Sequence, residues 1–459
     1  MVIKRSNNLF QALARILLLV FFFVLLFLLF YEGPINNKYL SVIVLILSVC
    51  EIITLISNRT VHNSGLLMIF FLYTLIVHNG FVIAYLFDEN YIHFQSAASM
   101  AFVNNDFYNK AIIISNIVIL AFVFSTEIVG KDLQNIDYRK ETYSNDKNSG
   151  VVAANVVGLS GLAFGGIYLA YIVYSRGLWM QGYAASLSAL ENNSLYIHVV
   201  VLTSLSMALL MAAGTEKGIK IGLILYGIIA VLHFSMGNRG EVMYAAVVCF
   251  ALYSIRFNRI KFRHILILGG LVVILIPLVR ISRELKLDMY TLNPFTSLLD
   301  VLAEEGIEIS PFTYTVQLVE TKYGHAFGAT YLNVFLEFLC RRFGSVSPLA
   351  IDRNIIKAIM PQEGMGYSMI AELYYNFGIW FACVIYMIFA WVIRKIDYRI
   401  YVGSISQNKK IFYSMLMVEM INLTRNDAST LPLYLVWTLI LYGSFILLSN
   451  MLGRRKGYR

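Results

Sequence analysis

Long runs of apolar residues, almost free of charge, constrain this chain more than any other feature. A helix needs about 20 apolar residues to cross roughly 30 Å of hydrocarbon, and twelve runs in the sequence approach or reach that length. Their limits are 12–31, 39–57, 66–87, 111–129, 151–174, 195–213, 219–236, 242–256, 264–281, 367–393, 409–424 and 431–450. Because 59% of the 459 residues are hydrophobic and only 14% are charged, an ordinary soluble domain is excluded. The sequence predicts an all-α integral membrane protein, a polytopic bundle of about 12 transmembrane helices in which residues 1–459 form a single domain.

The basic residues predict the orientation of these spans. With the N-terminus in the cytoplasm, 13 of the 36 Lys and Arg fall in outer segments and 23 fall in inner ones. Cytoplasmic loops of membrane proteins carry such an excess of basic residues. We therefore predict that both termini are cytoplasmic. The net charge of +9 is explained by this placement and does not indicate a nucleic-acid partner.

Two connecting segments are long enough to be considered by themselves. Residues 282–366 form a large outer loop between the ninth and tenth spans, and this loop contains the amphipathic stretch YLNVFLEFLCRRF. Loops of that length within a compact protein are usually functional, so we expect it to be ordered and to lie over the membrane surface or a cavity. Residues 130–150, which are polar, are predicted to be a cytoplasmic connector.

Four arginines at the outer ends of spans run against the orientation rule. They are Arg239, Arg280, Arg283 and Arg425. One interpretation is that each anchors its span by reaching the lipid headgroups. The other is that they converge on a lipid phosphate or pyrophosphate, because the planar guanidinium binds phosphate through two parallel hydrogen bonds and keeps its charge.

The stretch GNRGE, which separates two spans, is a candidate anion site. Gly237 and Gly240 permit a close backbone approach, and Asn238 can cap the helix that follows. The first N–H groups of that helix would add partial positive charge beside Arg239. We expect Glu241 to support the helix start or to orient the arginine, and a simple hairpin between two spans is the alternative.

Acid–base candidates are few. Glu372 lies just inside the outer end of the tenth span, after the small residues of GMGYSMIA, and His325 lies between glycines in the outer loop. An intramembrane carboxylate usually faces a cavity or a partner and can act as a general base. Asp427 follows Arg425 in TRND and is a supporting candidate, whereas Glu419 is interpreted as a structural pair.

Several motifs are missing from the sequence. There is no phosphate-binding GxxxxGK[ST] loop, no HExxH, no GxSxG, and none of the ten aspartates stands two residues from another. The four cysteines have no metal-ligand spacing. We therefore expect no metal and no cofactor, so that cationic side chains would have to stabilise a leaving diphosphate.

The order of motifs resembles a known family. GNRGE at a span junction, then a long outer loop, then GMGYSMIAELYYNFGIW, then TRND before the last span are similar to the Wzy-type O-antigen and polysaccharide repeat-unit polymerases of bacterial inner membranes. The resemblance implies a GT-C-like, metal-independent glycosyltransferase. Such an enzyme joins undecaprenyl-pyrophosphate-linked repeat units en bloc on the outer face of the membrane and releases undecaprenyl pyrophosphate.

The resemblance also suggests roles and partners. Arg239, Arg280, Arg283 and Arg425 would bind the pyrophosphate, and Glu372 or His325 would activate the acceptor hydroxyl. Donor and acceptor would both be lipid-linked repeat units, and a chain-length regulator protein is an implied partner. The expected location is the bacterial inner membrane.

Two alternatives stay open on the sequence. An O-antigen ligase uses the same type of donor and delivers the glycan to a different lipid. A flippase or transporter of lipid-linked oligosaccharide would be expected to show inverted repeats and paired broken helices, neither of which is evident.

Overall fold

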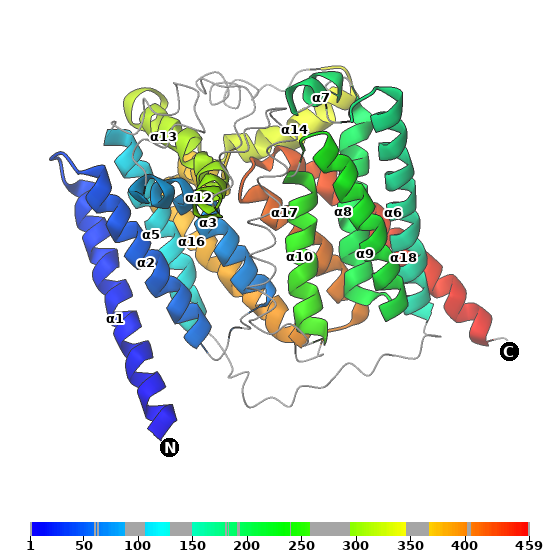
Figure 1. Ribbon diagram of the computed structural model, residues 1–459, viewed down its shortest axis with the longest axis horizontal. Helices are drawn as coiled ribbons and strands as arrows, with labels where there is room; N and C mark the ends of the chain where they lie inside the picture. The colour runs from blue at the N-terminus through cyan, green and yellow to red at the C-terminus, as the bar shows by residue number, and fades with distance from the viewer. Residues whose placement is uncertain are drawn as a thin grey trace.

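The computed structural model describes residues 2–58, 61, 64–87, 106–128, 149–179, 181, 183–190, 193–238, 240–257, 294–345, 367–401 and 405–457. Within these ranges every regular element is a helix (Figure 1). The helices stand side by side and form one bundle, and both chain termini lie at the same end of it. The all-α prediction is confirmed.

Among the described residues, nine helices are long and apolar enough to cross a membrane. They are α1 (Val2–Phe30), α2 (Asn37–Ser57), α3 (Leu66–Phe87), α5 (Asp106–Ile128), α6 (Ser149–Ser175), α8 (Ser194–Ala213), α9 (Glu216–Ser235), α16 (Met369–Tyr401) and α18 (Leu431–Gly457). The shorter α10 (Gly240–Phe257) and α17 (Gln407–Leu423) run between them. Eleven of the twelve predicted spans therefore coincide with a helix, and the twelfth, 264–281, lies outside the described residues.

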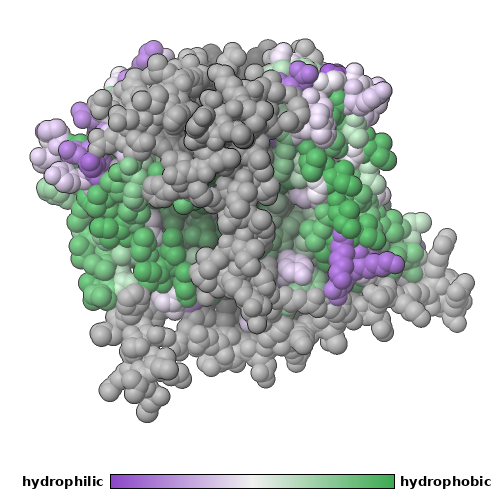
Figure 2. Space-filling model, in the orientation of Figure 1, coloured by the Kyte–Doolittle hydropathy of each residue, from purple (hydrophilic) through white to green (hydrophobic). Residues whose placement is uncertain are grey.

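Apolar side chains cover the flanks of the bundle. Phe23 and Phe27 on α1 are 64% and 67% exposed, and Ile167 on α6 is 72% exposed. Figure 2 shows these hydrophobic flanks, with polar side chains gathered toward the two ends. Exposed apolar surface on this scale is unfavourable in water but is stable against lipid tails. The chain is a multi-pass membrane protein.

The segment between α10 and α16 builds a layer at the end of the bundle opposite the termini, which we call the α14 end. Its elements are α12 (Pro294–Glu305), the short η3 (Gly306–Glu308), α13 (Ile309–Leu318), η4 (Val319–Tyr323) and α14 (Ala329–Arg342). Helix α14 crosses the end of the bundle, and α7 (Tyr183–Leu190) lies at the same end. Residues 282–293 and 346–366 of the predicted outer loop lie outside the described residues, as does the 130–148 part of the predicted connector.

This layer is seated on α3 by direct contact between backbones. A Cβ atom on Gly80 would lie 2.3 Å from the carbonyl oxygen of Leu302, and one on Gly306 would lie 2.1 Å from the backbone nitrogen of Phe81. No side chain fits at either position without a shift of backbone atoms. The two glycines therefore fix the position of η3 against α3, and with it the position of the residues on both sides of Gly306.

Helix α16 is not straight. Gly378 has φ +75° and ψ 179°, which is a non-helical conformation that favours glycine. The break separates a short segment, residues 369–377, from the rest of the helix. Residues 326 and 327 bind to the helix just before the break: their N–H groups donate to the carbonyl oxygens of Tyr375 and Asn376 at 2.9 and 2.8 Å. The single predicted span at 367–393 is thus a broken helix whose first segment, residues 369–377, binds the chain that leads into α14.

Replacement of Gly306 by Ala should destabilise the protein. The new methyl group must push η3 away from α3, and forcing an extra methyl into a packed site costs about 1–3 kcal/mol. Gly227→Ala in α9 is the matched control, because no atom lies within 4 Å of its Cβ position. Thermal unfolding in detergent should show a lower Tm for Gly306→Ala only. An equal Tm for both variants would contradict the close contact.

Candidate functional site

Arg425 lies in the turn that follows α17, and two carboxylates hold its side chain. Its Nη1 donates to Glu305 Oε2 at 2.7 Å, and its Nε donates to Glu308 Oε1 at 3.1 Å. The arginine side chain is 19% exposed and that of Glu308 only 1%. The ion pairs are therefore poorly screened by water. We call these three residues the Arg425 cluster.

One carboxylate oxygen in the cluster is left open. Glu308 Oε2 is buried and finds no hydrogen-bond partner among the described residues. Burial raises the pKa of Glu308 to about 7, although the neighbouring Arg425 acts to lower it. Glu308 can therefore gain or lose a proton close to neutral pH. Its second carboxylate oxygen therefore keeps an unused lone pair within the cluster.

A side chain near the start of α10 contacts Asn426, the residue after Arg425. Asn426 Nδ2 donates to Tyr244 Oη at 3.0 Å. The Tyr244 side chain folds back along its helix, since a Cβ on Gly240 would lie 3.3 Å from Tyr244 Oη. The first turn of α10 and the turn carrying Arg425 are thus joined by one hydrogen bond.

The predicted GNRGE turn ends α9 in a defined way. Gly237 has φ +74°, its N–H donates to the Phe234 carbonyl at 2.9 Å, and the Asn238 N–H donates to the His233 carbonyl at 2.9 Å. This pair of bonds is the Schellman motif, which requires a left-handed residue and so favours glycine. Asn238 Nδ2 also donates to Tyr196 Oη at 2.8 Å, which anchors the turn to α8.

Three of the predicted arginines cannot be placed. Arg239, Arg280 and Arg283 lie outside the described residues, and for Glu241 only the backbone, within α10, is described. Their phosphate-binding and supporting roles stay predictions. The flanking residues nevertheless locate the segment: Gly240 begins α10 directly beside the Tyr244–Asn426 bond.

Glu372 is the centre of a second group of contacts, the Glu372 network. The carboxylate accepts from Thr330 Oγ1 at 2.8 Å and from the backbone N–H of Ala428 at 2.9 Å. Asn376 Nδ2 donates to Thr330 Oγ1 at 2.6 Å, and the Thr330 N–H donates to Asn376 Oδ1 at 3.3 Å. These bonds join α16, α14 and the turn before α18. Both oxygens of Glu372 are engaged, as expected of a residue that positions its neighbours.

Asp427 caps the short helix η5 (Ala428–Thr430) through its side chain. Its Oδ1 accepts from the Ser429 N–H at 2.9 Å. The same turn is fixed to the residues just before α16 by the Tyr367 N–H, which donates to the Arg425 carbonyl at 3.1 Å. Asp427 thus shapes the turn that carries Arg425.

His325 packs against the break in α16. Its ring lies edge-on to Tyr374 with centroids 5.5 Å apart, and a Cβ on Gly378 would lie 3.2 Å from its Nε2. The Nδ1 atom is buried and has no hydrogen-bond partner within the described residues. His325 therefore borders the same α14–α16 junction as the Glu372 network and retains an unused ring nitrogen.

Several residues of this site were not predicted from the sequence, namely Glu305, Glu308, Tyr244, Thr330 and Asn376. The two glutamates flank Gly306 in EEGIE, three residues apart, which places both on one side of a helical turn. That spacing could have identified Glu305 and Glu308 as a pair of neighbouring carboxylates. Nothing in the sequence singles out Thr330 or Asn376, because such ordinary polar residues become informative only when the fold brings them to Glu372.

The chain matches the family model of the O-antigen polysaccharide polymerase Wzy over residues 18–455. It belongs to this family. It is also similar to the Protein CapE of Staphylococcus aureus, with 21% identity over 372 residues that cover 79% of this chain and 81% of the relative. No solved structure matches the chain.

Membership of the Wzy family settles the general activity. The protein is a polysaccharide polymerase of the inner membrane that acts on lipid-linked repeat units. The three segments that carry the resemblance in sequence meet in space, because α10 contacts the TRND turn through Tyr244 and α16 contacts it through Glu372. This meeting point is the candidate active site of the polymerase.

Thr330→Val should loosen the α14–α16 junction of the Wzy protein. It removes the hydrogen bond that Glu372 Oε1 accepts from Thr330 and the one that Asn376 Nδ2 donates to it, and loss of a buried hydrogen bond costs about 1–3 kcal/mol. Thr321→Val is the control, since the exposed Thr321 hydroxyl donates to the Gln317 carbonyl, four residues earlier in the chain, at 2.7 Å. Hydrogen exchange should rise in residues 329–342 for Thr330→Val alone. Equal exchange in both variants would contradict a positioning role for Glu372.

Proposed function

We propose that this polymerase transfers a glycan en bloc from an undecaprenyl-pyrophosphate donor to a second lipid-linked repeat unit at the α14 end. The observation that carries the proposal is the meeting of the Arg425 cluster, the α10 start and the Glu372 network in one place. A cationic group, a carboxylate with a free lone pair and a helix N-terminus are there brought together. These are the groups that a diphosphate leaving group and an attacking hydroxyl require.

The proposed reaction is a single displacement at the anomeric carbon. The acceptor oxygen forms a bond to this carbon, and the bond from the carbon to the phosphate oxygen breaks. The electron pair leaves with undecaprenyl pyrophosphate, and the hydroxyl proton passes to a base on the protein. We propose that arginine side chains, and no divalent metal, balance the charge of the leaving group, since the sequence has no DxD pair.

Among the candidate bases, Glu308 is best supported. A base needs an unused lone pair and a pKa near the working pH, and Glu308 Oε2 meets both conditions. Glu372 has both oxygens occupied, so we assign it a positioning role. His325 is the second candidate, through its unpartnered Nδ1.

We propose different roles for Arg425 and for the other three arginines. Arg425 already donates through Nε and Nη1 to the two glutamates, so we propose that it orients the base and offers its remaining donors to the phosphate. Arg239, Arg280 and Arg283 would then supply most of the charge that binds the pyrophosphate. A bound diphosphate beside the first turn of α10 would also accept N–H groups from that turn.

The α14 end is proposed to face away from the cytoplasm, with both termini cytoplasmic. Helices α9 and α17 begin, and α10, α16 and α18 finish, at the end of the bundle that holds the termini. The topology predicted from the sequence assigns 23 of the 36 Lys and Arg to that side of the membrane. A chain-length regulator would then meet the polymerase at the exposed surface of the α14 layer.

Arg239→Ala and Arg280→Ala should each abolish chain extension while leaving membrane insertion intact. A charge-assisted hydrogen bond is worth about 1.5–3 kcal/mol, and several act together on one diphosphate. Lysine at the same positions should restore only part of the activity, because it lacks the planar fork. Polymer length on gels, with purified protein and lipid-linked repeat units, is the measurement. The control is Arg454→Ala, because Arg454 is an exposed residue at the end that holds the termini. Polymer of normal length from both the Arg239→Ala and the Arg280→Ala protein would exclude these two arginines from the site.

A pH profile tests the base. If Glu308 must be ionised to accept the proton, the rate should fall about tenfold per pH unit below a pKa near 7. Glu308→Gln should lower the rate by roughly 10²–10⁴-fold and remove this acid limb. Glu305→Gln should keep the limb, because the base is still present. A Glu308→Gln enzyme that retains both rate and limb would transfer the role to His325.

A further inference from the structure

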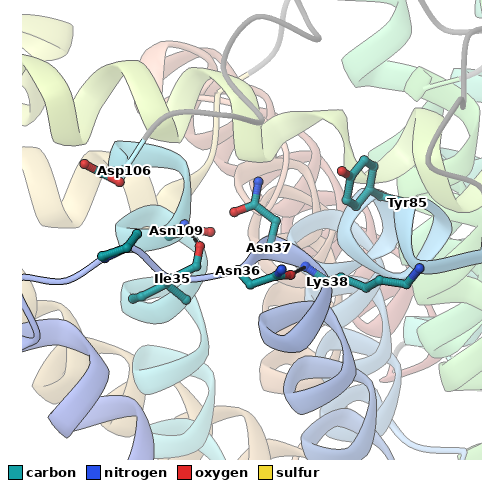
Figure 3. Close-up of a pocket in the computed structure, with 8 residues that line it drawn as sticks. Ile35, Asn36, Asn37, Lys38, Tyr85, Asp106 and Asn109 are labelled. Atoms are coloured by element: carbon teal, nitrogen blue, oxygen red, sulfur yellow. Dashed lines mark hydrogen bonds between the residues drawn. The ribbon is translucent and has the colours of Figure 1, made fainter.

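A second polar site lies at the α14 end, between the starts of α2 and α5. It is a pocket of about 410 Å³ whose polar lining comes from Asn36, Asn37, Lys38, Tyr85, Asp106 and Asn109 (Figure 3). Its volume falls within the range of small-molecule sites, about 300–1,000 Å³. None of the residues used in the proposed reaction lines it.

Asn109 shows that the pocket has an unmet hydrogen-bonding requirement. This side chain is only 5% exposed, and its Nδ2 donates to the Ile35 carbonyl at 3.1 Å. That bond fixes the amide, and its Oδ1 is buried with no partner among the described residues. Buried acceptors are nearly always satisfied in proteins. The open oxygen therefore requires a donor that the described residues do not supply.

The surroundings of Asn109 define the chemistry of that donor. The pocket holds one carboxylate, Asp106, and one ammonium group, Lys38, so it has no excess of either charge. Amides from Asn37 and Asn109 and the aromatic ring of Tyr85 complete its lining, with Asp106 on one side in the view and Tyr85 on the other (Figure 3). The carboxylate would repel an anion, and an apolar group would leave the buried Oδ1 of Asn109 without a donor. Neutral hydroxyl groups, which donate and accept, suit all of these partners.

The pocket is linked to the α14–α16 junction through α5 and η4. Lys110, the residue after Asn109, pairs with Glu320 of η4 at 2.5 Å. The segment that follows η4 carries His325 to the break in α16. A chain of sugars bound at the reacting centre therefore has a second polar surface available at the same end of the bundle.

We propose that this pocket is a glycan subsite that binds the sugar hydroxyls of a repeat unit remote from the reacting end. The inference rests on the proposed function, and it adds where the glycan is held between transfers. Asn109 Oδ1 and the Asp106 carboxylate accept from the hydroxyls, and Lys38 donates to them. Retention of the glycan between transfers would favour long polymers over early release.

Binding is tested without catalysis. The probe is free glycan of two to six repeat units, cleaved from the polysaccharide of the source strain, freed of lipid and phosphate, and labelled with a fluorophore. Fluorescence anisotropy with the full-length protein in nanodiscs should give saturable binding, and Asp106→Leu should weaken it roughly fivefold or more, as expected for the loss of a charge-assisted bond. Gln181→Ala, an exposed polar residue at the same end of the bundle, is the matched control and should bind as the wild type.

A second measurement does not depend on the Asp106 variant. Asn37→Cys and Gln181→Cys are compared for reaction with a polar maleimide, each in a Cys340→Ser background, because the other three native cysteines are buried. Saturating free glycan should slow labelling at position 37 several-fold and leave position 181 unchanged. Glycerol phosphate at the same concentration separates a sugar ligand from a lipid headgroup and should give no protection.

The outcomes separate this inference from the proposed function. Equal affinity of Asp106→Leu and wild type, equal labelling at position 37 with and without glycan, or protection by glycerol phosphate alone would each overturn the subsite. A wild-type protein that binds glycan but forms no polymer from lipid-linked repeat units would overturn the proposed reaction while the subsite stands.

Discussion

The ion pairs between Arg425, Glu305 and Glu308 are the interaction on which the α14 end depends. They join the turn before α18 to the layer formed by α12 and η3, across 117 and 120 residues of sequence. Removing one partner from a buried ion pair usually costs about 3–5 kcal/mol, because the remaining charge is left uncompensated. The close contact of Gly306 with α3 fixes the backbone that carries the two glutamates. Arginine and carboxylates therefore meet at a site whose parts are each held by separate helices.

A site built in this way is ordered before a substrate arrives. The Glu372 network fixes α14 and the Arg425 turn to residues 369–377 of α16, and the Schellman turn at Gly237 fixes the entry to α10. Groups that are already oriented stabilise developing charge without a reorganisation cost at the moment of reaction. Because both oxygens of Glu372 accept hydrogen bonds, the proposed reaction assigns the role of base to another carboxylate, Glu308.

The sequence predicts those features that depend on local patterns, and it does not predict those that depend on contacts between residues far apart in the chain. Hydrophobic runs reflect local burial in lipid, so they located the helices, including the short α10 and α17. The break at Gly378 was not predicted, because a glycine within an apolar run is common and its conformation depends on the chain that packs against it. Arg425 stood out through its position, but its partners come from a distant loop, and hydrophobicity carries no information about such pairing. Arg239, Arg280 and Arg283 remain predictions from position alone.

The charge balance of the cluster constrains how a diphosphate can bind there. Two carboxylates face one guanidinium, so with both ionised the cluster carries a net negative charge, which repels a phosphate group. If a diphosphate binds there as proposed, further cationic groups must offset this repulsion, and this is the role proposed for Arg239, Arg280 and Arg283. A diphosphate close to Glu308 would raise the pKa of that carboxyl further, which strengthens it as a base but reduces its ionised fraction. In the proposed reaction the outer arginines therefore have two effects: they bind the leaving group, and they keep Glu308 ionised until the acceptor hydroxyl arrives.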